Sequence, residues 1–164
     1  MKNKSSDLSV VGWREWLALP ELGIEHIKAK IDTGARTSAL HAFLVEPFDR
    51  QGKQWVRFSI HPLQRNSEYV VECEAQVKDR RMVSDSGGHK EYRYVIESSI
   101  SLGHMKWLAE LTLTDRDSMK FRMLLGRTAL DGKFLVDPAV SYAIGNKPAK
   151  HTKNTERNRS RREP

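Results

Sequence analysis

The sequence predicts an all-β domain, and three observations support this fold class. Short stretches with alternating apolar and polar side chains recur along most of the chain, which is the pattern of strands that bury one face. Clusters of Asp, Gly, Asn and Ser separate these stretches, as tight turns between strands require. Helical periodicity is confined to residues 37–44 and 127–130. Closely spaced strands with only one or two short helices are typical of closed or sandwich-like β folds.

The predicted strands follow one another along the chain. Residues 13–19 alternate loosely and stop at Pro20, whereas residues 26–31 alternate strictly and lead into Asp32. Two further strands flank the turn-like stretch 49–53 and predict a β-hairpin. The strands of this hairpin are expected at residues 42–48 and 54–60. The other strands are expected at residues 69–77, 91–100, 107–113, 121–125 and 134–136.

The polar, glycine-bearing segment 83–90 lies between two predicted strands. It fits two interpretations, an active-site flap or an ordinary hairpin connection. The sequence does not choose between them.

Length and composition indicate one globular domain in a reducing compartment. A chain of 164 residues, 38% hydrophobic and 30% charged, suits a single domain with its own core. It contains neither an apolar run of about 20 residues, which a membrane helix needs, nor a signal-peptide pattern near the N-terminus. The single cysteine, Cys73, lies in an alternating stretch and predicts a half-buried strand residue. We therefore expect a cytoplasmic protein without a membrane partner.

The positive charge is concentrated at the C-terminus. Residues 146–164 carry seven Lys or Arg against two Glu, and thus most of the net charge of +7. Because this segment has almost no apolar side chains, we expect a disordered basic tail. The expected organisation is a flexible N-terminus at residues 1–10, one domain at residues 11–145, and the tail. The nearly balanced domain does not favour a nucleic-acid partner, although the tail could serve as a phosphate-binding arm.

The main chemical signal is the run Asp32-Thr33-Gly34, which follows an apolar strand. Two neighbouring carboxylates cannot easily ionise together, so they share a proton, and one can activate water while the other protonates the substrate. Thr33 could bond across such a pair, and Gly34 lets its backbone N–H approach the carboxylate. The alternative is an Asp that caps a turn at a strand end. The motif therefore needs support from elsewhere in the chain.

That support comes from Leu124-Leu125-Gly126-Arg127, an apolar run that ends in glycine and opens a short helix. Here the chain resembles the retropepsins, the retroviral-type aspartic peptidases. In that family an Asp-Thr-Gly-Ala strand end is followed late in the domain by two apolar residues, Gly and Arg. The resemblance implies a closed acid-protease β-barrel in which the late element packs beneath the catalytic loop.

The resemblance narrows to a bacterial and archaeal branch of retropepsin-like aspartic endopeptidases, some of which are described as ATP-dependent zinc proteases. It covers about residues 11–145, outside the tail. Members often occur beside glutamate ligases, which implies glutamate-tailed peptides or proteins, including poly-glutamate, as substrates. The motifs that carry the resemblance lie at residues 32–42, 115–116, 119–121, 123–127 and 134–138.

With one Asp-Thr-Gly, the chain supplies one catalytic carboxylate. The resemblance implies a homodimer in which two copies of Asp32 face each other. A second acid from the same chain is the alternative, with Asp137, Asp115 and Asp85 as candidates. Asp137 precedes Pro138 and is better explained as a turn residue.

The expected site contains catalytic and supporting residues but no metal or cofactor. Asp32, Thr33 and Gly34 are the catalytic candidates, and the supporting candidates are Ala35, Arg36, Leu125, Gly126 and Arg127. Arg36 either binds an acidic group or forms a structural ion pair, whereas Arg127 is expected to brace the fold or the dimer interface. Thr37 and Ser38 are expected to cap a helix.

Three functions remain open from the sequence. The first is an aspartic peptidase acting on peptide or protein substrates, and the second is a peptide-binding module of the same fold. A zinc peptidase is the least favoured, because the six histidines are scattered and no His-Glu-x-x-His spacing occurs.

Overall fold

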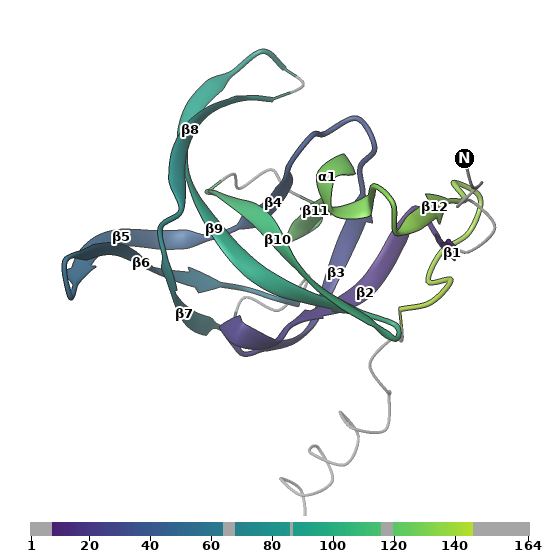
Figure 1. Ribbon diagram of the computed structural model, residues 1–164, viewed down its shortest axis with the longest axis horizontal. Helices are drawn as coiled ribbons and strands as arrows, with labels where there is room; N and C mark the ends of the chain where they lie inside the picture. The colour runs from purple at the N-terminus through teal and green to yellow at the C-terminus, as the bar shows by residue number, and fades with distance from the viewer. Residues whose placement is uncertain (1–7, 64–67, 86, 116–119, 146–164) are drawn as a thin grey trace, which may run out of the picture.

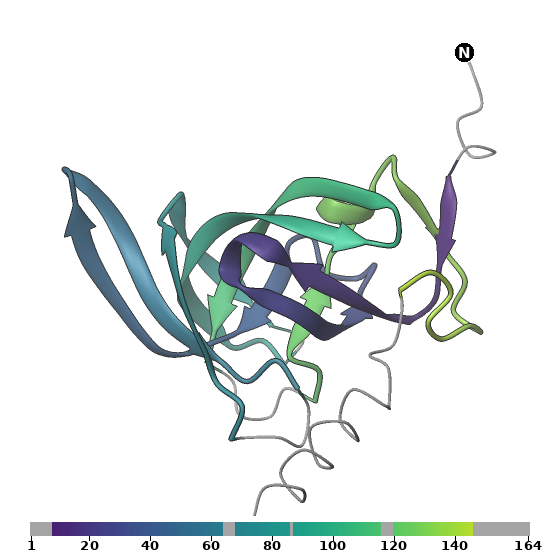
Figure 2. The same cartoon turned by 90° about the horizontal axis from the view of Figure 1, so that it is seen from below.

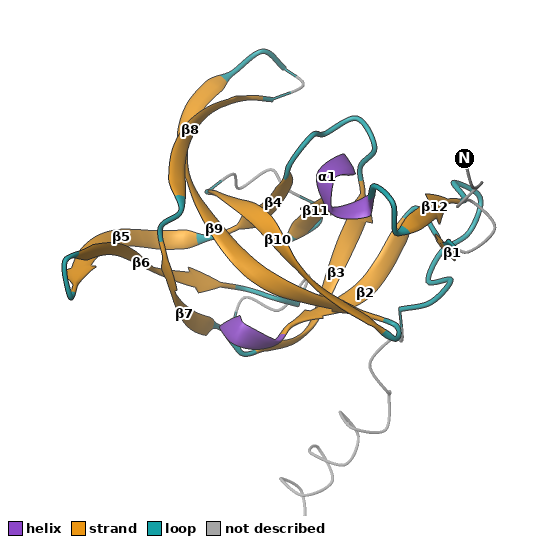
Figure 3. Ribbon diagram, in the orientation of Figure 1, coloured by secondary structure: helices purple, strands orange, loops and turns teal. Residues whose placement is uncertain are grey.

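The computed structural model describes residues 8–63, 68–85, 87–115 and 120–145, and it confirms a mainly β chain (Figure 3). Within these residues, helical structure is limited to a 3₁₀ turn, η2 (Pro20–Leu22), and one short helix, α1 (Arg127–Leu130). No described helix is long and apolar enough to cross a membrane. Of the N-terminus expected to be flexible at residues 1–10, residues 1–7 lie outside the described residues, whereas residues 9 and 10 belong to strand β1 (Ser9–Val11). The expected tail, residues 146–164, also lies outside the described residues.

The central feature is a ring of hydrogen-bonded strands. The order of pairing runs β10-β4-β11-β3-β2-β9, and β9 pairs again with β10. The ring is joined between β2 and β9 by a single residue pair, Ala18 with Ser101, so we describe it as a ring of strands rather than as a closed barrel. Its members are β2 (Arg14–Leu19), β3 (Ile24–Ile31), β4 (Ser38–His41), β9 (Lys90–Leu102), β10 (Met105–Thr114) and β11 (Met123–Leu125).

A second sheet extends sideways from the ring. It consists of β5 (Phe43–Arg50), β6 (Lys53–Ile60) and β7 (Val71–Gln76), and the β5–β6 hairpin extends well beyond the ring (Figure 2). The predicted hairpin is confirmed, with its turn shortened to Gln51 and Gly52. Their φ values of 53° and 77° are those of a tight hairpin turn. A short parallel pair, β1 (Ser9–Val11) with β12 (Phe134–Val136), brings the two ends of the domain together.

The apolar faces of both sheets share one core. Leu19, Ile27 and Leu111 of the ring are fully buried, as are Val56 and Phe58 of the second sheet. All belong to one contiguous hydrophobic cluster. This core accounts for the alternation seen in the sequence, since one face of each strand packs inward.

The helix expected at residues 37–44 is wrong. Residues 38–41 form β4, which pairs in parallel with β10 and antiparallel with β11, and β5 begins at Phe43. All four residues of β4 are buried. A short run buried on both faces shows no period of two, so its pattern alone cannot distinguish a strand from a helix.

A strand missed by the sequence pattern, β8 (Asp79–Ser84), pairs with the first half of β9 to form a hairpin. The two strands project together away from the ring (Figure 1). In that view the tip of the hairpin rises on the same side of the ring as α1 and the β3–β4 connection. The described residues 83–85 and 87–90 of the polar segment thus lie at the end of a long hairpin, on the side of the ring where α1 and the β3–β4 connection lie.

Candidate active site

Asp32 lies where β3 leaves the ring. The last residue of β3, Ile31, is buried and donates its N–H to the carbonyl of Trp13 at 2.8 Å. The Asp32 N–H donates to the carbonyl of Leu125 in β11, also at 2.8 Å. The main chain of Asp32 is therefore fixed from two sides, while its side chain is only half-buried.

The carboxylate of Asp32 is oriented by its own turn. Its Oδ1 accepts hydrogen bonds from the N–H groups of Gly34 at 3.0 Å and Ala35 at 3.2 Å. A Cβ added at Gly34 would lie 3.2 Å from the same oxygen, so glycine allows this close approach. Among the described residues, Oδ2 receives no hydrogen bond. The turn thus holds one oxygen and leaves the other available for a water or a second acid.

The β11–α1 junction braces the loop that carries Asp32. Backbone N–H groups of Arg127 and Thr128 donate to the carbonyls of Ala35 (2.8 Å) and Arg36 (3.0 Å). The guanidinium of Arg127 donates to the carbonyls of Thr33 (2.9 Å) and Gly34 (3.2 Å). Arg127 therefore acts on the main chain of the loop.

Gly126 allows this brace to form. A Cβ at Gly126 would come within 2.7 Å of the carbonyl carbon of Thr37, closer than real contacts allow. Its N–H donates to the Ser38 Oγ at 3.0 Å. The candidate sites Leu125, Gly126 and Arg127 are thus brought together with the Asp32 loop.

The side chains of Thr33 and Arg36 point outward into solvent. Both residues are exposed, and Arg36 forms no ion pair with any described residue. The structural ion pair considered for Arg36 is therefore not found within the described part of the chain. A cation beside the carboxylate loop remains available for an external anion.

Two of the three alternative acids have their carboxylates in local turns. The Oδ1 of Asp137 accepts from the N–H of Ala139 at 3.0 Å, as expected for a turn residue. The Oδ1 of Asp85 accepts from the N–H groups of Gly87 and His89, both at 2.9 Å, and so shapes the hairpin tip. Asp115 is exposed and borders residues outside the described part.

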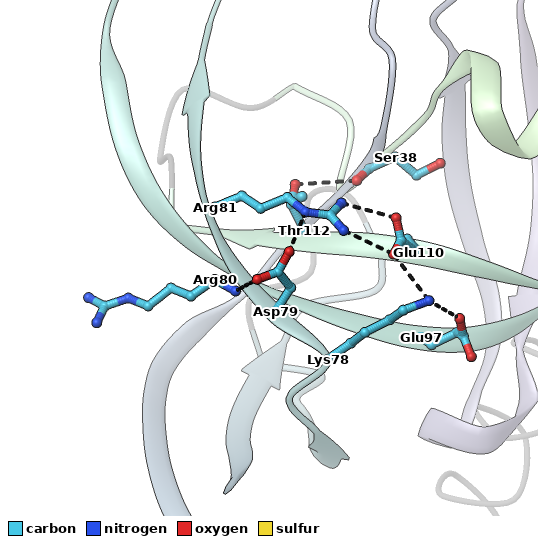
Figure 4. A network of polar contacts seen from close by, with 8 residues as sticks. All are labelled: Ser38, Lys78, Asp79, Arg80, Arg81, Glu97, Glu110 and Thr112. Carbon is cyan, nitrogen blue, oxygen red and sulfur yellow. Dashed lines mark hydrogen bonds and ion pairs between the residues drawn. The ribbon is translucent and has the colours of Figure 1, made fainter.

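Charged side chains fix the base of the β8–β9 hairpin (Figure 4). Glu97 and Glu110 face each other on β9 and β10, an arrangement that is destabilising for two like charges alone. Lys78 lies between them, with its Nζ 2.6 Å from Glu97 and 3.2 Å from Glu110. Arg81 adds two hydrogen bonds to Glu110, at 3.0 and 3.2 Å. These contacts fix the start of β8 against β10.

The ion pairs that Lys78 and Arg81 form with Glu97 and Glu110, here called the clamp, should weaken in acid. Hydrogen bonds from Arg81 first, and from Lys78, lower the pKa of Glu110. Because the pKa of Glu110 is lower in the folded protein, its ionised form stabilises the fold at pH values above the pKa of an unfolded glutamate, about 4.3. This stabilisation is lost as the pH falls through the pKa of Glu110 in the folded protein. We expect Glu110→Gln to lower the free energy of unfolding by about 0.5–1 kcal/mol at pH 7, and by progressively less below about pH 4.

Urea unfolding of both proteins at pH 7 and pH 3 measures this difference. Exposed Glu25 on β3 offers a matched control through Glu25→Gln, which should have little effect at either pH. A difference for Glu110→Gln that is independent of pH would contradict the proposed ionic contribution.

The sequence reasoning missed two residues near the loop. Ser38, expected as a helix cap, is fully buried in β4 and binds Gly126. Thr112 of β10 is 2% exposed and donates to the Ser38 carbonyl at 3.3 Å. Only their polar character within apolar strands distinguished them in the sequence. Among the described residues, no group of three or more His, Cys, Asp or Glu is placed to hold a metal ion.

The sequence of this chain is similar to part of longer curated proteins. Curated relatives named probable alpha-L-glutamate ligase include a Shewanella pealeana protein, 50% identical over 143 residues, and a Desulfotalea psychrophila protein, 45% identical over 136 residues. The matches cover 87% and 83% of this chain but only 31% and 29% of those relatives. The chain thus spans about a third of their length.

The chain also resembles a solved structure and the members of one protein family. The crystal structure of Lpg0085 from Legionella pneumophila, a protein described as of unknown function, superposes with a TM-score of 0.71 at 25% identity. It covers 83% of this chain and 98% of its own. A family model described as retropepsin-like aspartic endopeptidase RimB matches residues 10–147. This chain therefore belongs to the RimB-like family of retropepsin-like aspartic endopeptidases.

Proposed function

We propose that the protein is an aspartic endopeptidase in which Asp32 activates water. The supporting observation is the carboxylate itself, fixed through Oδ1 by two backbone N–H groups and free of described hydrogen bonds at Oδ2. A carboxylate that only capped a turn would not need the separate brace from Arg127. In this proposal the ring of strands serves as the barrel of the acid-protease fold, and the protein works in the cytoplasm.

The second carboxylate is supplied by Asp32 of another copy in a symmetric dimer. Two facing acids share one proton, because like charges at close range cannot both ionise. The ionised acid takes a proton from water as the water oxygen attacks the peptide carbonyl carbon, and the protonated acid donates its proton to the carbonyl oxygen. The acid that took a proton from water then donates it to the leaving nitrogen, and the other acid takes the proton of one hydroxyl group. The C–N bond breaks to give a carboxylic acid and an amine, and the two acids again share one proton. The exposure of Thr33 and Gly34 is consistent with a partner approaching this loop.

The proposed substrates are peptides or proteins with glutamate tails. The curated relatives carry the name alpha-L-glutamate ligase, and this chain matches about a third of each. In this proposal, the peptidase removes the glutamate residues that a ligase of the kind named for these relatives would add. Arg36, exposed and without a described ion pair beside the loop, suits a glutamate side chain.

The β8–β9 hairpin is the candidate lid of this site. It lies on the same side of the ring as α1 and the β3–β4 connection (Figure 1), and its tip is shaped by Asp85. Closing over a bound peptide would shield the site from bulk solvent while the attacking water stays between the carboxylates.

The test is an incubation of the full chain with a peptide that carries a C-terminal run of glutamates, followed by mass spectrometry of the products. A peptide of equal length with glutamine in the tail is the matched control. We expect cleavage of the glutamate peptide, inhibition by a statine-type transition-state mimic, and no effect of a metal chelator.

Each alternative gives a different result. Binding of the peptide by calorimetry without any product would support the non-catalytic binding module. Loss of cleavage with a chelator would support a zinc peptidase. Preferential cutting of the glutamine peptide would contradict the acidic specificity but leave the aspartic chemistry intact.

A further inference from the structure

A chain of buried hydrogen bonds runs from the β8–β9 hairpin to the brace of the Asp32 loop. Arg93 of β9 donates through Nη1 to the Thr112 Oγ1 at 3.4 Å, and Thr112 donates to the Ser38 carbonyl at 3.3 Å. Figure 4 shows the Thr112–Ser38 contact beside the clamp. The Ser38 Oγ in turn accepts from the Gly126 N–H at 3.0 Å. Thr112 and Ser38 therefore join β9, β10, β4 and the junction between β11 and α1.

Burial makes these bonds costly to break. Ser38 is fully buried, Thr112 is 2% exposed and Arg93 is 7% exposed. Buried polar groups are almost always hydrogen-bonded, and removing one partner leaves the other without solvent as a replacement. At its hairpin end, Arg93 also donates to the Glu91 Oε1 at 2.5 Å, which accepts from Thr114 at 2.6 Å. The hairpin base is thus attached to β10 at two threonines.

Strand register also places Thr112 in a row of paired residues that leads to β3, the strand that carries Asp32 at its end. Thr112 pairs with Ala39, Ala39 pairs with Leu124, and Leu124 pairs with Lys30 on β3. Directly paired residues project from the same face of a sheet. Lys30 precedes Asp32 by two residues, so the row ends one residue before the last residue of β3, Ile31. A displacement of Thr112 can therefore reach the Asp32 loop in two ways. One is the row of paired strand residues that ends at Lys30, and the other is the hydrogen bond between Ser38 and Gly126.

We propose that Thr112 and Ser38 are positioning residues that couple the hairpin to the Asp32 loop. When the hairpin moves, Arg93 moves with it, and Thr112 transmits the change to the Ser38 carbonyl. The hydrogen bond between the Ser38 hydroxyl and the Gly126 N–H then changes. Gly126 precedes Arg127, whose guanidinium binds the carbonyls of Thr33 and Gly34. The catalytic consequence of this coupling rests on the proposed peptidase function, whereas the coupling itself does not.

The experiment measures hydrogen exchange by NMR in an Asp32→Asn background, where no peptidase activity is needed. Thr112→Val is compared with Thr112→Ser, which keeps the hydroxyl, and with Thr114→Val. Thr114 lies on the same strand at 3% exposure and contacts Glu91, but no recorded hydrogen bond joins it to Ser38.

We expect Thr112→Val to raise the exchange rate of the Gly126 amide about tenfold, the effect of losing one buried hydrogen bond. Thr112→Ser should keep the parental rate, and Thr114→Val should loosen the hairpin amides alone. Equal protection of Gly126 in Thr112→Val and Thr114→Val would overturn the proposal. If Thr112→Val fails to fold, Arg93→Lys tests the same chain from its hairpin end and should raise Gly126 exchange.

A second readout applies to the protein with Asp32 intact. Cleavage by Thr112→Val should show a lower kcat with a shifted pH profile, since the carboxylate geometry changes, and Thr112→Ser should restore both. A change confined to KM would mean that Thr112 affects only substrate access, and it would refute coupling to the catalytic loop. If neither the parent nor the Thr112 variants cleaved peptide, the proposed function would be contradicted. The hydrogen-exchange rate of the Gly126 amide would still test the coupling.

Discussion

Asp32→Asn should abolish peptide hydrolysis while leaving the fold unchanged. An amide cannot take a proton from water, and general acid–base catalysis contributes about 10²–10⁴-fold to such reactions. We therefore expect kcat to fall by about a hundredfold to ten-thousandfold. Because Asn retains an oxygen for the Gly34 and Ala35 N–H groups, circular dichroism and thermal unfolding should match the parent.

Mixing the two proteins tests where the second carboxylate comes from. Random pairing of equal amounts gives about one quarter parental dimers and one half mixed dimers. If both copies of Asp32 are needed, the mixture should retain about one quarter of the parental activity. If each chain completes its own site, about one half should remain.

Two controls make the loss specific. Asp131→Asn alters an exposed acid that follows α1 and should leave kcat unchanged. Asp137→Asn alters the alternative acid, whose Oδ1 already accepts the Ala139 N–H. Full activity in Asp32→Asn would refute the proposed chemistry, and a loss in Asp137→Asn equal to that in Asp32→Asn would point to an acid pair within one chain.

The sequence predicted most strands because their patterns reflect burial on one face. Residues 26–31 of β3 alternate, pack their apolar side chains into the core, and lead directly into Asp32. The strand β8 escaped this reasoning because its six residues include Asp79, Arg80 and Arg81. Arg81, which is partly exposed, forms hydrogen bonds to Glu110 on β10 instead of packing into the core. A pattern of apolar residues cannot reveal a strand held by ion pairs.

The candidate site was predictable where chemistry depends on neighbours in sequence. Asp32 is bound by amides two and three residues away, and Gly34 was expected for that reason. Ser38 contacts Gly126 across 88 positions and Thr112 across 74 positions. Such contacts depend on the arrangement of β4 between β10 and β11, which no local pattern encodes. The error of assigning a helix at residues 37–44 concealed the role of Ser38.

Glu15→Ala should cause the largest loss of stability among single substitutions outside the site. Glu15 is fully buried in β2, and its carboxylate accepts four backbone N–H groups. They belong to Gly12 at 2.6 Å, Ala143 at 2.8 Å, Ile144 at 3.2 Å and Gly145 at 2.8 Å. Removing the carboxylate leaves these donors unpaired, at about 1–3 kcal/mol for each that water cannot reach.

The substitution should also affect the catalytic strand. Gly12 and Gly145 approach other backbone segments so closely that a Cβ would lie 2.1 Å from the carbonyl oxygens of Val140 and Trp16, respectively. The segment between Gly12 and Glu15 includes Trp13, whose carbonyl accepts the N–H of Ile31. The Glu15 carboxylate therefore holds the end of the domain against the strand that supports Asp32.

We expect Glu15→Ala to lower the free energy of unfolding by about 3–5 kcal/mol and Tm by roughly 10 °C or more. Glu15→Gln should also be destabilising, because its NH₂ group would face N–H donors instead of accepting from them. Glu25→Ala, at an exposed position on β3, is the matched control and should change Tm by less than about 2 °C. If Glu15→Ala also changed Tm by less than about 2 °C, water would have to enter and bind the four backbone amides. The Glu15 carboxylate would then not be required to hold the two ends of the domain together.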